Sequence, residues 1–160
     1  MGFESNKRVI KVMNNRRVTE TIGGKLCHFR SQFEYDWASY LQWQKENNLI
    51  LNWEFESRTF NFQNHGYNRG PFMYLIDFTV TENDGHVLYQ ECKGYHDGQT
   101  NSKFQRTLAC YPDLSKNDFE LILMRIPKRG KGANRRRVAE KYVRRIVDAS
   151  EIFKQIKGVI

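Results

Sequence analysis

The stretch Tyr74–Gly94, YLIDFTVTENDGHVLYQECKG, decides the fold, because it predicts two β-strands joined by a tight turn. Alternating β-branched and aromatic residues flank the dipeptide Asp84-Gly85, which favours hairpin geometry. A hairpin closed at this dipeptide places Asp77 of the first strand opposite Glu91 of the second, to within about one residue of register.

The charged residues of this stretch are its informative part. Glu91 and Lys93 are two residues apart, so they project from one face of their strand while Cys92 projects from the other. The hairpin therefore gathers two carboxylates, Asp77 and Glu91, and the ammonium of Lys93 at one place in a sheet. Placing these charges together in a sheet costs free energy, which a bound metal ion or a catalytic role would explain. The alternative is a simple cross-strand ion pair between Asp77 and Lys93.

Length and composition restrict the class of protein. The chain has 160 residues, which suits one domain with a sizeable core. It has no apolar run of 18 residues and no apolar segment with a cleavage site at its N-terminus, so we expect a cytoplasmic protein that contacts no membrane. The three cysteines Cys27, Cys92 and Cys110 are far apart, which favours neither a disulfide framework nor a zinc site.

The net charge of +8 is unevenly distributed along the chain. Residues 7–30 hold seven basic residues and one acidic residue, and residues 125–145 hold ten basic residues and one acidic residue. Residues 31–124 hold seven basic residues against thirteen acidic ones. Basic ends suit a polyanion and an acidic middle suits a cation, as in a protein that binds nucleic acid and a divalent metal. A charge run that only solvates a surface is the alternative.

Local patterns predict the remaining elements. Residues 1–30 are expected to form a loosely ordered basic arm, residues 31–126 the core, and residues 127–160 a basic linker and C-terminal helix beside the core. The expected elements, in chain order, are a helix over 32–47 capped by Ser31, a strand over 49–62, the hairpin, a short helix from Thr100 or Ser102 to Cys110 or Tyr111, a buried strand over 118–126, and a helix over 134–156.

This order predicts an α/β fold. Three antiparallel strands, a crossover helix and a returning strand imply a mixed sheet of four to five strands with helices against it. Glu34 lies at the edge of the apolar stripe of the first helix, where its carboxylate can reach the sheet beneath. The alternative is that Glu34 only complements the helix dipole.

The combination resembles a known nuclease family. Glu34 in an early helix, Asp77 in the second strand and Glu91-Cys92-Lys93 in the third resemble the PD-(D/E)xK nuclease superfamily, although Ile76 stands where the family name has proline. The stretches FRSQFE (29–34), IDF (76–78) and ECKG (91–94) resemble the small phage Holliday-junction-resolving endonucleases of the endonuclease I type. This resemblance spans residues 29–124 and implies a restriction-endonuclease-like core.

The resemblance implies metal-dependent phosphodiester hydrolysis by Glu34, Asp77, Glu91 and Lys93. Mg²⁺, which Mn²⁺ can replace, takes oxygen ligands; these would be Asp77, Glu91 and the backbone carbonyl of Cys92, with Glu34 binding a second ion or acting through a water. The metal activates a water and offsets the charge that builds on the scissile phosphate. Lys93 is expected to orient or deprotonate that water and to stabilise the transition state.

The expected substrate is branched DNA, in phage recombination or DNA processing, and junction cleavage by two coordinated nicks implies a homodimer. No module that reads bases is evident, which favours recognition of shape and phosphates. The residues expected to contact DNA are Arg30, Lys103, Arg106, Arg135, Arg136, Arg137, Lys141, Arg144 and Arg145. The alternatives are a sequence- or end-specific endonuclease on the same core, and a nucleic-acid-binding protein without catalytic activity.

Overall fold

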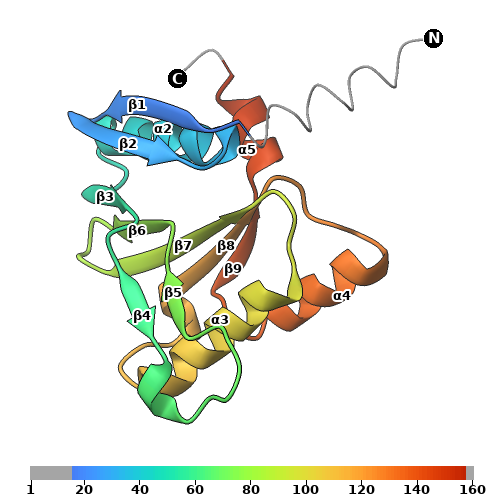
Figure 1. Cartoon of the computed structure of the whole chain (residues 1–160). Coiled ribbons are helices and arrows are strands. Elements are labelled where there is room, and N and C mark those ends of the chain that lie inside the picture. Colours follow the sequence, from blue (N-terminus) through green and yellow to red (C-terminus); the bar gives the residue numbers. More distant parts are fainter. Residues whose placement is uncertain (1–15, 158–160) are drawn as a thin grey trace.

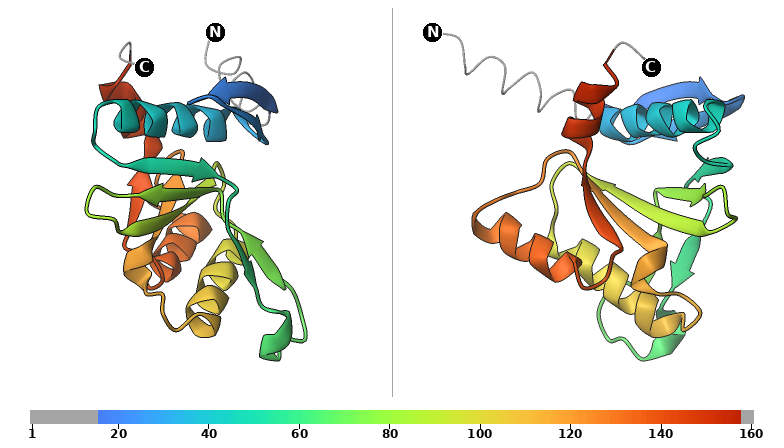
Figure 2. Two further views of the ribbon diagram at one scale, coloured as in Figure 1. Left: turned by 90° about the vertical axis from the view of Figure 1, so that its left-hand side faces the viewer. Right: turned by 180° about the vertical axis from the view of Figure 1, so that it is seen from behind.

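The computed structural model describes residues 16–157, which form a mixed α/β fold in three layers. A central sheet lies between one layer that holds α2 and the β1–β2 hairpin and another that holds α3 and α4 (Figure 1). Figure 2 shows the same layers from two further directions, with α5 beside α2. Residues 1–15 of the predicted basic arm lie outside the described residues.

Nine strands, four α-helices and two 3₁₀ turns make up the described part of the chain. The strands are β1 (Val18–Ile22), β2 (Lys25–Phe29), β3 (Asn52–Phe55), β4 (Thr59–Asn61), β5 (Met73–Leu75), β6 (Phe78–Thr81), β7 (Val87–Lys93), β8 (Phe119–Leu123) and β9 (Arg145–Asp148). The helices are α2 (Gln32–Glu46), α3 (Gly98–Cys110), α4 (Gly130–Ala139) and α5 (Ala149–Gln155), and the 3₁₀ turns are η1 (Gln63–His65) and η2 (Lys116–Asp118).

The central sheet has five strands in the order β3-β6-β7-β8-β9. The pairs β3–β6 and β6–β7 are antiparallel, while β7–β8 and β8–β9 are parallel. The predicted mixed sheet flanked by helices is therefore confirmed. Because β7 and β8 run in the same direction, their carboxyl ends, Lys93 and Leu123, meet at one edge of the sheet.

Helix α2 begins and ends where the sequence predicts. The Oγ of Ser31 accepts a hydrogen bond from the backbone N–H of Glu34, which satisfies one of the free donors of the first turn. The helix ends before Asn47, and Asn48 takes a left-handed conformation with φ of 57° that stops it. Trp37 and Leu41 are buried against the sheet.

Two apolar clusters fill the space on the two faces of the sheet. One joins α2 to the sheet and includes Trp37, Phe78 and Cys92, and the other joins α3 and α4 to the opposite face and includes Tyr74 and Phe104. Cys92 therefore projects to the α2 face, as the hairpin periodicity predicts. Burial of large aromatic side chains in both clusters contributes most of the stabilisation.

The β6–β7 hairpin differs from the prediction at its start. Tyr74 and Leu75 belong to β5, which pairs with β4 in a separate two-stranded sheet, so the first strand of the hairpin begins only at Phe78. The same change breaks the expected strand over 49–62 into β3 and β4, because Glu56 turns the chain between them with φ of 49°. The turn at Asp84-Gly85 is confirmed.

The described part of the basic arm is ordered, contrary to the prediction. Strands β1 and β2 form a hairpin that turns at Gly23-Gly24, where both glycines have positive φ, and it packs against α2. Phe29 is buried beneath that helix. An apolar contact with a distant element thus orders a segment whose composition suggested a loose arm.

The single C-terminal helix predicted over 134–156 is wrong. This region forms α4, strand β9 and helix α5, and α4 begins inside the predicted linker at Gly130. The apolar residues Ile146 and Val147 lie in β9, which pairs in parallel with β8 and so joins the central sheet. Long-range pairing with β8 outweighs a spacing that also fits a helix.

Helix α3 begins earlier than expected. Its N-cap is Asp97, whose carboxylate accepts a hydrogen bond from the backbone N–H of Thr100, and neither Thr100 nor Ser102 is the cap. Its end at Cys110 and the buried strand after Asp118 are confirmed. No helix within residues 16–157 has the length and apolar character needed to cross a membrane.

Candidate active site

The β6–β7 hairpin places Asp77 opposite Glu91. The ladder ends at the pair Phe78–Gln90, and just beyond it the carboxylate of Asp77 accepts a hydrogen bond from the backbone N–H of Cys92, so Asp77 lies beside Glu91 to within about one residue, as predicted. Glu91 and Lys93 project from the same face of β7, and Nζ of Lys93 lies 3.0 Å from Oε1 of Glu91. Strand β7 and the residue that precedes β6 thus supply three of the four predicted catalytic side chains.

Asp77 is held at the centre of the site. Its side chain is almost fully buried, Oδ2 accepts a hydrogen bond of 2.8 Å from the backbone N–H of Cys92, and Oδ1 accepts one of 3.0 Å from Nη2 of Arg30. Burial, followed by the negative charges of Glu91 and Glu34, raises the pKa of Asp77 well above its ordinary value. The surroundings of Asp77 therefore stabilise its ionised form too little to offset the cost of burial.

Helix α2 supplies Glu34 to the same site. Glu34 is 8% exposed, and its Oε2 accepts a hydrogen bond of 2.8 Å from the backbone N–H of Arg30. Burial raises the pKa of Glu34, and the charges of Glu56 and Glu91 act in the same direction. The prediction that Glu34 reaches the sheet next to Asp77 and Glu91 is consistent with this shared environment.

Arg30 lies inside the site. Its Nη2 is 3.0 Å from Oδ1 of Asp77 and 2.9 Å from Oε1 of Glu56, and its Nε is 3.9 Å from Oε1 of Glu34. The arginine bridges carboxylates from three separate elements. The sequence predicts Arg30 only as a DNA contact. Glu56, which lies between β3 and β4, is not among the predicted site residues.

Tyr74 is a further member of the site. Its hydroxyl donates a hydrogen bond of 2.9 Å to Oε2 of Glu91, and the ring is 1% exposed. Burial and the charges of Glu91 and Asp77 raise the pKa of Tyr74 well above its ordinary value, so the phenol stays a donor. In the sequence this tyrosine is only the first residue of the stretch Tyr74–Gly94, without a predicted role.

We call the resulting group the acid cluster. It consists of the carboxylates Glu34, Glu56, Asp77 and Glu91 and the cations Arg30 and Lys93. Four carboxylates share two cations, so the cluster carries a formal charge of −2 when all four are ionised, and Glu34, Asp77 and Glu91 are buried. Such an excess is unfavourable in a low-dielectric environment unless a further cation joins it or protons neutralise it.

The chemistry of the acid cluster fits a divalent cation. Carboxylate oxygens are the ligands that Mg²⁺ prefers, and two positive charges would match the excess of the cluster. Within residues 16–157, no three His, Cys, Asp or Glu side chains converge closely enough to hold an ion as they stand. Arg30, whose side chain is 59% exposed, occupies oxygens of Asp77 and Glu56 that a cation would otherwise share.

Most of the arginines and lysines predicted to contact DNA have partners within the protein. Arg144 and Arg145 bind Glu120, Arg136 binds Glu140, and the others are held through polar or aromatic contacts. The polar contacts are those of Arg106 with the carbonyls of Arg69 and Pro71, Arg135 with Tyr95 and His96, and Arg137 with Asn134, while Lys103 lies over the ring of Tyr74. Lys141 is exposed.

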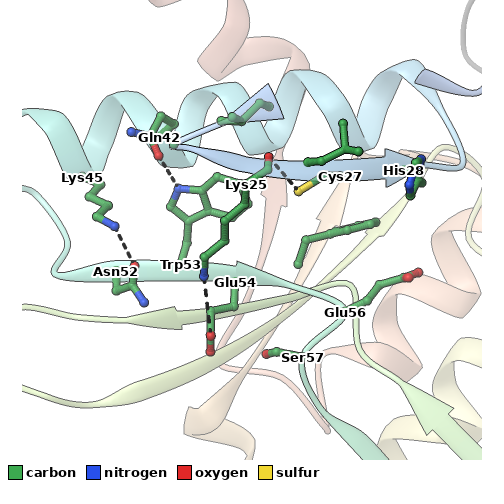
Figure 3. A pocket seen from close by; sticks show the side chains of 14 residues that line it. Lys25, Cys27, His28, Gln42, Lys45, Asn52, Trp53, Glu54, Glu56 and Ser57 are labelled. Carbon is green, nitrogen blue, oxygen red and sulfur yellow. Dashed lines mark hydrogen bonds and ion pairs between the residues drawn. The ribbon is translucent and has the colours of Figure 1, made fainter. Parts of the chain in front are cut away.

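A pocket of about 400 Å³ lies beside the acid cluster rather than in it. Figure 3 shows it between β2 and β3 beneath α2, with Lys25 and Lys45 among its lining side chains. Glu56 belongs to both the pocket and the acid cluster. The pocket therefore opens next to the carboxylates without containing Asp77 or Glu91.

Comparison with known proteins adds no assignment to this geometry. No model of a known protein family matches the chain, and no curated protein sequence matches it.

Proposed function

We propose that this protein is a divalent-metal-dependent DNA endonuclease. The observation that carries the proposal is the acid cluster, in which the paired carboxylates Asp77 and Glu91 stand beside Lys93 with an unmatched negative charge. A protein that only binds DNA gains nothing from buried carboxylates next to a polyanion. The order of helix, three antiparallel strands, helix and parallel strand agrees with a restriction-endonuclease-like core.

Each residue has a distinct part in the proposed reaction. A divalent cation held by Asp77, Glu91, the Cys92 carbonyl and, directly or through water, Glu34 would offset charge on the scissile phosphate and activate a water. Lys93 has its ammonium 3.0 Å from Glu91 and would donate hydrogen bonds to the phosphate oxygens as negative charge develops on them.

The surrounding residues would fix the geometry. Tyr74 holds one oxygen of Glu91 with its hydroxyl, which leaves the other oxygen oriented toward Lys93. Arg30 compensates Asp77 and Glu56, and its side chain is 59% exposed, so with a cation bound at these carboxylates it would be available to pair with a DNA phosphate. Exchange of Arg30 between carboxylates and phosphate would couple metal binding to DNA binding.

Branched DNA in phage recombination or DNA processing is the proposed substrate, with a homodimer making the two nicks. The sequence stretches that resemble the small phage junction-resolving endonucleases support this choice. Sequence- or end-specific cleavage on the same core would be revealed by the same experiment, through a preference for unbranched duplex.

The test is cleavage of labelled four-way-junction, duplex and single-stranded DNA by the full chain, with Mg²⁺, with Mn²⁺ and with chelator. We expect cleavage of the junction with either metal, none with chelator, and none by Lys93→Ala, while Lys116→Ala on the exposed turn η2 cuts normally. DNA binding without cleavage of any substrate would contradict the proposal and favour a binding protein.

A further inference from the structure

A small pocket lies at the edge of the sheet where β7 and β8 end. Its volume is about 120 Å³, and it is lined by the loop after β7, including Gly94 and His96, by the segment after β8, including Arg125 and Pro127, and by Gly132 of α4. Figure 1 shows these two loops leaving the same edge of the sheet toward α3 and α4. Ligands of parallel sheets bind outside the carboxyl ends of the strands, where this pocket lies.

The N-terminus of α4 forms one wall of the pocket. Its N-cap, Arg129, makes no side-chain hydrogen bond to the first turn, whereas the caps of α2, α3 and α5 each do so. The free N–H groups of the first turn and the helix dipole attract an anion. A Cβ on Gly132 would meet Pro127 at 3.0 Å, so the glycine lets the helix start pack directly on the loop.

His96, which also lines the pocket, provides an independent observation. It is 5% exposed, and its Nε2 is 2.8 Å from Oδ1 of Asn101. Since the amide nitrogen of Asn101 donates to the carbonyl of Arg135, Oδ1 is the acceptor and Nε2 carries the proton. Nδ1 is buried and has no hydrogen-bond partner among the described residues, although His96 belongs to the pocket lining.

The missing partner of Nδ1 agrees with an anion. Burial lowers the pKa of His96, so the ring is neutral when the pocket holds no charge. A phosphate beside the ring would favour the protonated form, in which Nδ1 donates to a phosphate oxygen. A buried polar atom without a partner costs free energy, and a bound phosphate would remove that cost.

The segment that carries Arg125 and Pro127 from β8 to the start of α4 is strongly basic. Arg125, Lys128, Arg129 and Lys131 are exposed, none of them forms an ion pair among residues 16–157, and residues 125–131 include no acidic residue. These cations differ from Arg144 and Arg145, which Glu120 already holds. Their charge is therefore available to an anion from solution.

We infer that this pocket binds a phosphate group of a polynucleotide strand, next to the phosphate that is presented to Lys93. Gly94 follows Lys93 directly, so the pocket begins one residue from the proposed catalytic group. A phosphate anchored there would set the position of the strand over the acid cluster without reading bases. The inference rests on the proposed function for the strand that it positions, whereas the phosphate site itself can be tested without cleavage.

The test is a titration of the ¹⁵N-labelled full chain with inorganic phosphate in the presence of chelator, followed by amide NMR. We expect saturable shifts at the amides of Gly94, His96 and Gly132 and at the imidazole Nδ1. Arg125→Ala, at an exposed position, should weaken binding about tenfold, as for loss of a charge-assisted hydrogen bond. Lys116→Ala, on the exposed turn η2 at the other end of β8, should bind like the unmodified protein.

Gly94→Ala is a second variant that does not strain the fold. Gly94 is not among the glycines with positive φ, and an added Cβ meets no heavy atom within 4 Å, so the methyl group projects into open space at the pocket. It should weaken phosphate binding and leave the spectrum otherwise folded. No shifts at these amides, or equal affinity in Arg125→Ala and Gly94→Ala, would overturn the inference.

A second titration, with a short DNA duplex in chelator, separates a polynucleotide from free phosphate. DNA should shift the same amides, and inorganic phosphate should compete with it. If inorganic phosphate binds and DNA leaves these amides unchanged, the assignment to a polynucleotide is overturned. If the protein cuts DNA but shows no phosphate shifts, the inference fails while the proposed function stands; if the shifts appear and no DNA is cut, the phosphate site stands and the endonuclease proposal fails.

Discussion

Two groups of charged side chains adjoin the β6–β7 hairpin, and they differ in charge balance. The acid cluster has four carboxylates and two cations. The ion-pair network has three of each sign when His86 is protonated: Glu82, Asp118 and Glu120 with His86, Arg144 and Arg145. The ion-pair network satisfies its charges within the fold, whereas the excess of the acid cluster is the feature that we propose a divalent cation would balance.

The ion pairs and pKa shifts of the two groups agree with this difference in charge balance. In the ion-pair network, Oε1 of Glu120 is 2.9 Å from Nη2 of Arg144 and 2.6 Å from Nε of Arg145, and hydrogen bonds from Arg144 lower the pKa of Glu82. In the acid cluster, burial and neighbouring carboxylates raise the pKa of Asp77 and of Glu34. The two groups therefore differ in charge balance, and this difference is the basis of the proposed function.

The largest expected effect is on activity, from Glu91→Gln in the acid cluster. The change removes a negative ligand and the partner of Lys93, so cleavage of junction DNA should fall by a factor on the order of 10³. Glu82→Gln in the ion-pair network is the matched control and should keep activity within about twofold. Steady-state cleavage rates of both folded variants check this, and equal losses would end the distinction between the two groups.

The next effect is on stability, from Glu120→Ala in the ion-pair network. Glu120 is fully buried and accepts hydrogen bonds from Gln90, Arg144 and Arg145, so its loss should lower the free energy of unfolding by about 3 kcal/mol. Arg145→Ala should cost less than about 1 kcal/mol, because that side chain is 64% exposed. Urea denaturation measures both, and a small loss for Glu120→Ala would contradict the role assigned to this network.

The acid cluster should also control how stability depends on pH. Because the pKa of Asp77 and of Glu34 is raised in the folded state, stability should fall as pH rises from the ordinary carboxyl value of about 4 toward the folded values. Glu34→Gln should flatten this decline in chelator by about 1 kcal/mol. Denaturation at a series of pH values checks the slope, and a stability that rises over this range would contradict the excess charge.

The smallest effect comes from His86. Hydrogen bonds to Glu82 and Asp118 raise the pKa of His86, so its stabilisation is fully present below the ordinary value of about 6.5 and is lost as pH rises through the folded value. His86→Gln should cost about 0.5 kcal/mol at pH 6 and almost nothing at pH 9. A cost that is equal at both pH values would show that the imidazolium does not contribute.

The sequence predicts those parts of the molecule that depend on local signals. Ser31 caps α2, and Asp84-Gly85 closes the hairpin, so the positions of Glu34, Asp77 and Glu91 relative to their own elements follow from neighbouring residues. The alternation of Glu91 and Lys93 on β7 follows from the period of a strand.

The missed parts depend on contacts between distant residues. Arg30 reaches Asp77 across 47 positions and Tyr74 reaches Glu91 across 17, and neither pairing leaves a local pattern. Strand β9 has only four residues, and its pairing with β8 becomes visible only when the sheet is assembled. The sequence shows the exposed cations of residues 125–131 as part of a basic run. The pocket beside them forms only where the parallel strands β7 and β8 end side by side, and that pairing leaves no local sequence pattern.

Calorimetric titration of Mg²⁺ into the full chain without DNA tests most directly whether the acid cluster holds a divalent cation. We predict saturable binding by the unmodified protein and by Glu82→Gln, and its loss in Asp77→Asn, which removes one of the two unmatched charges. Absence of Mg²⁺ and Mn²⁺ binding by the unmodified protein, or undiminished binding by Asp77→Asn, would contradict the account.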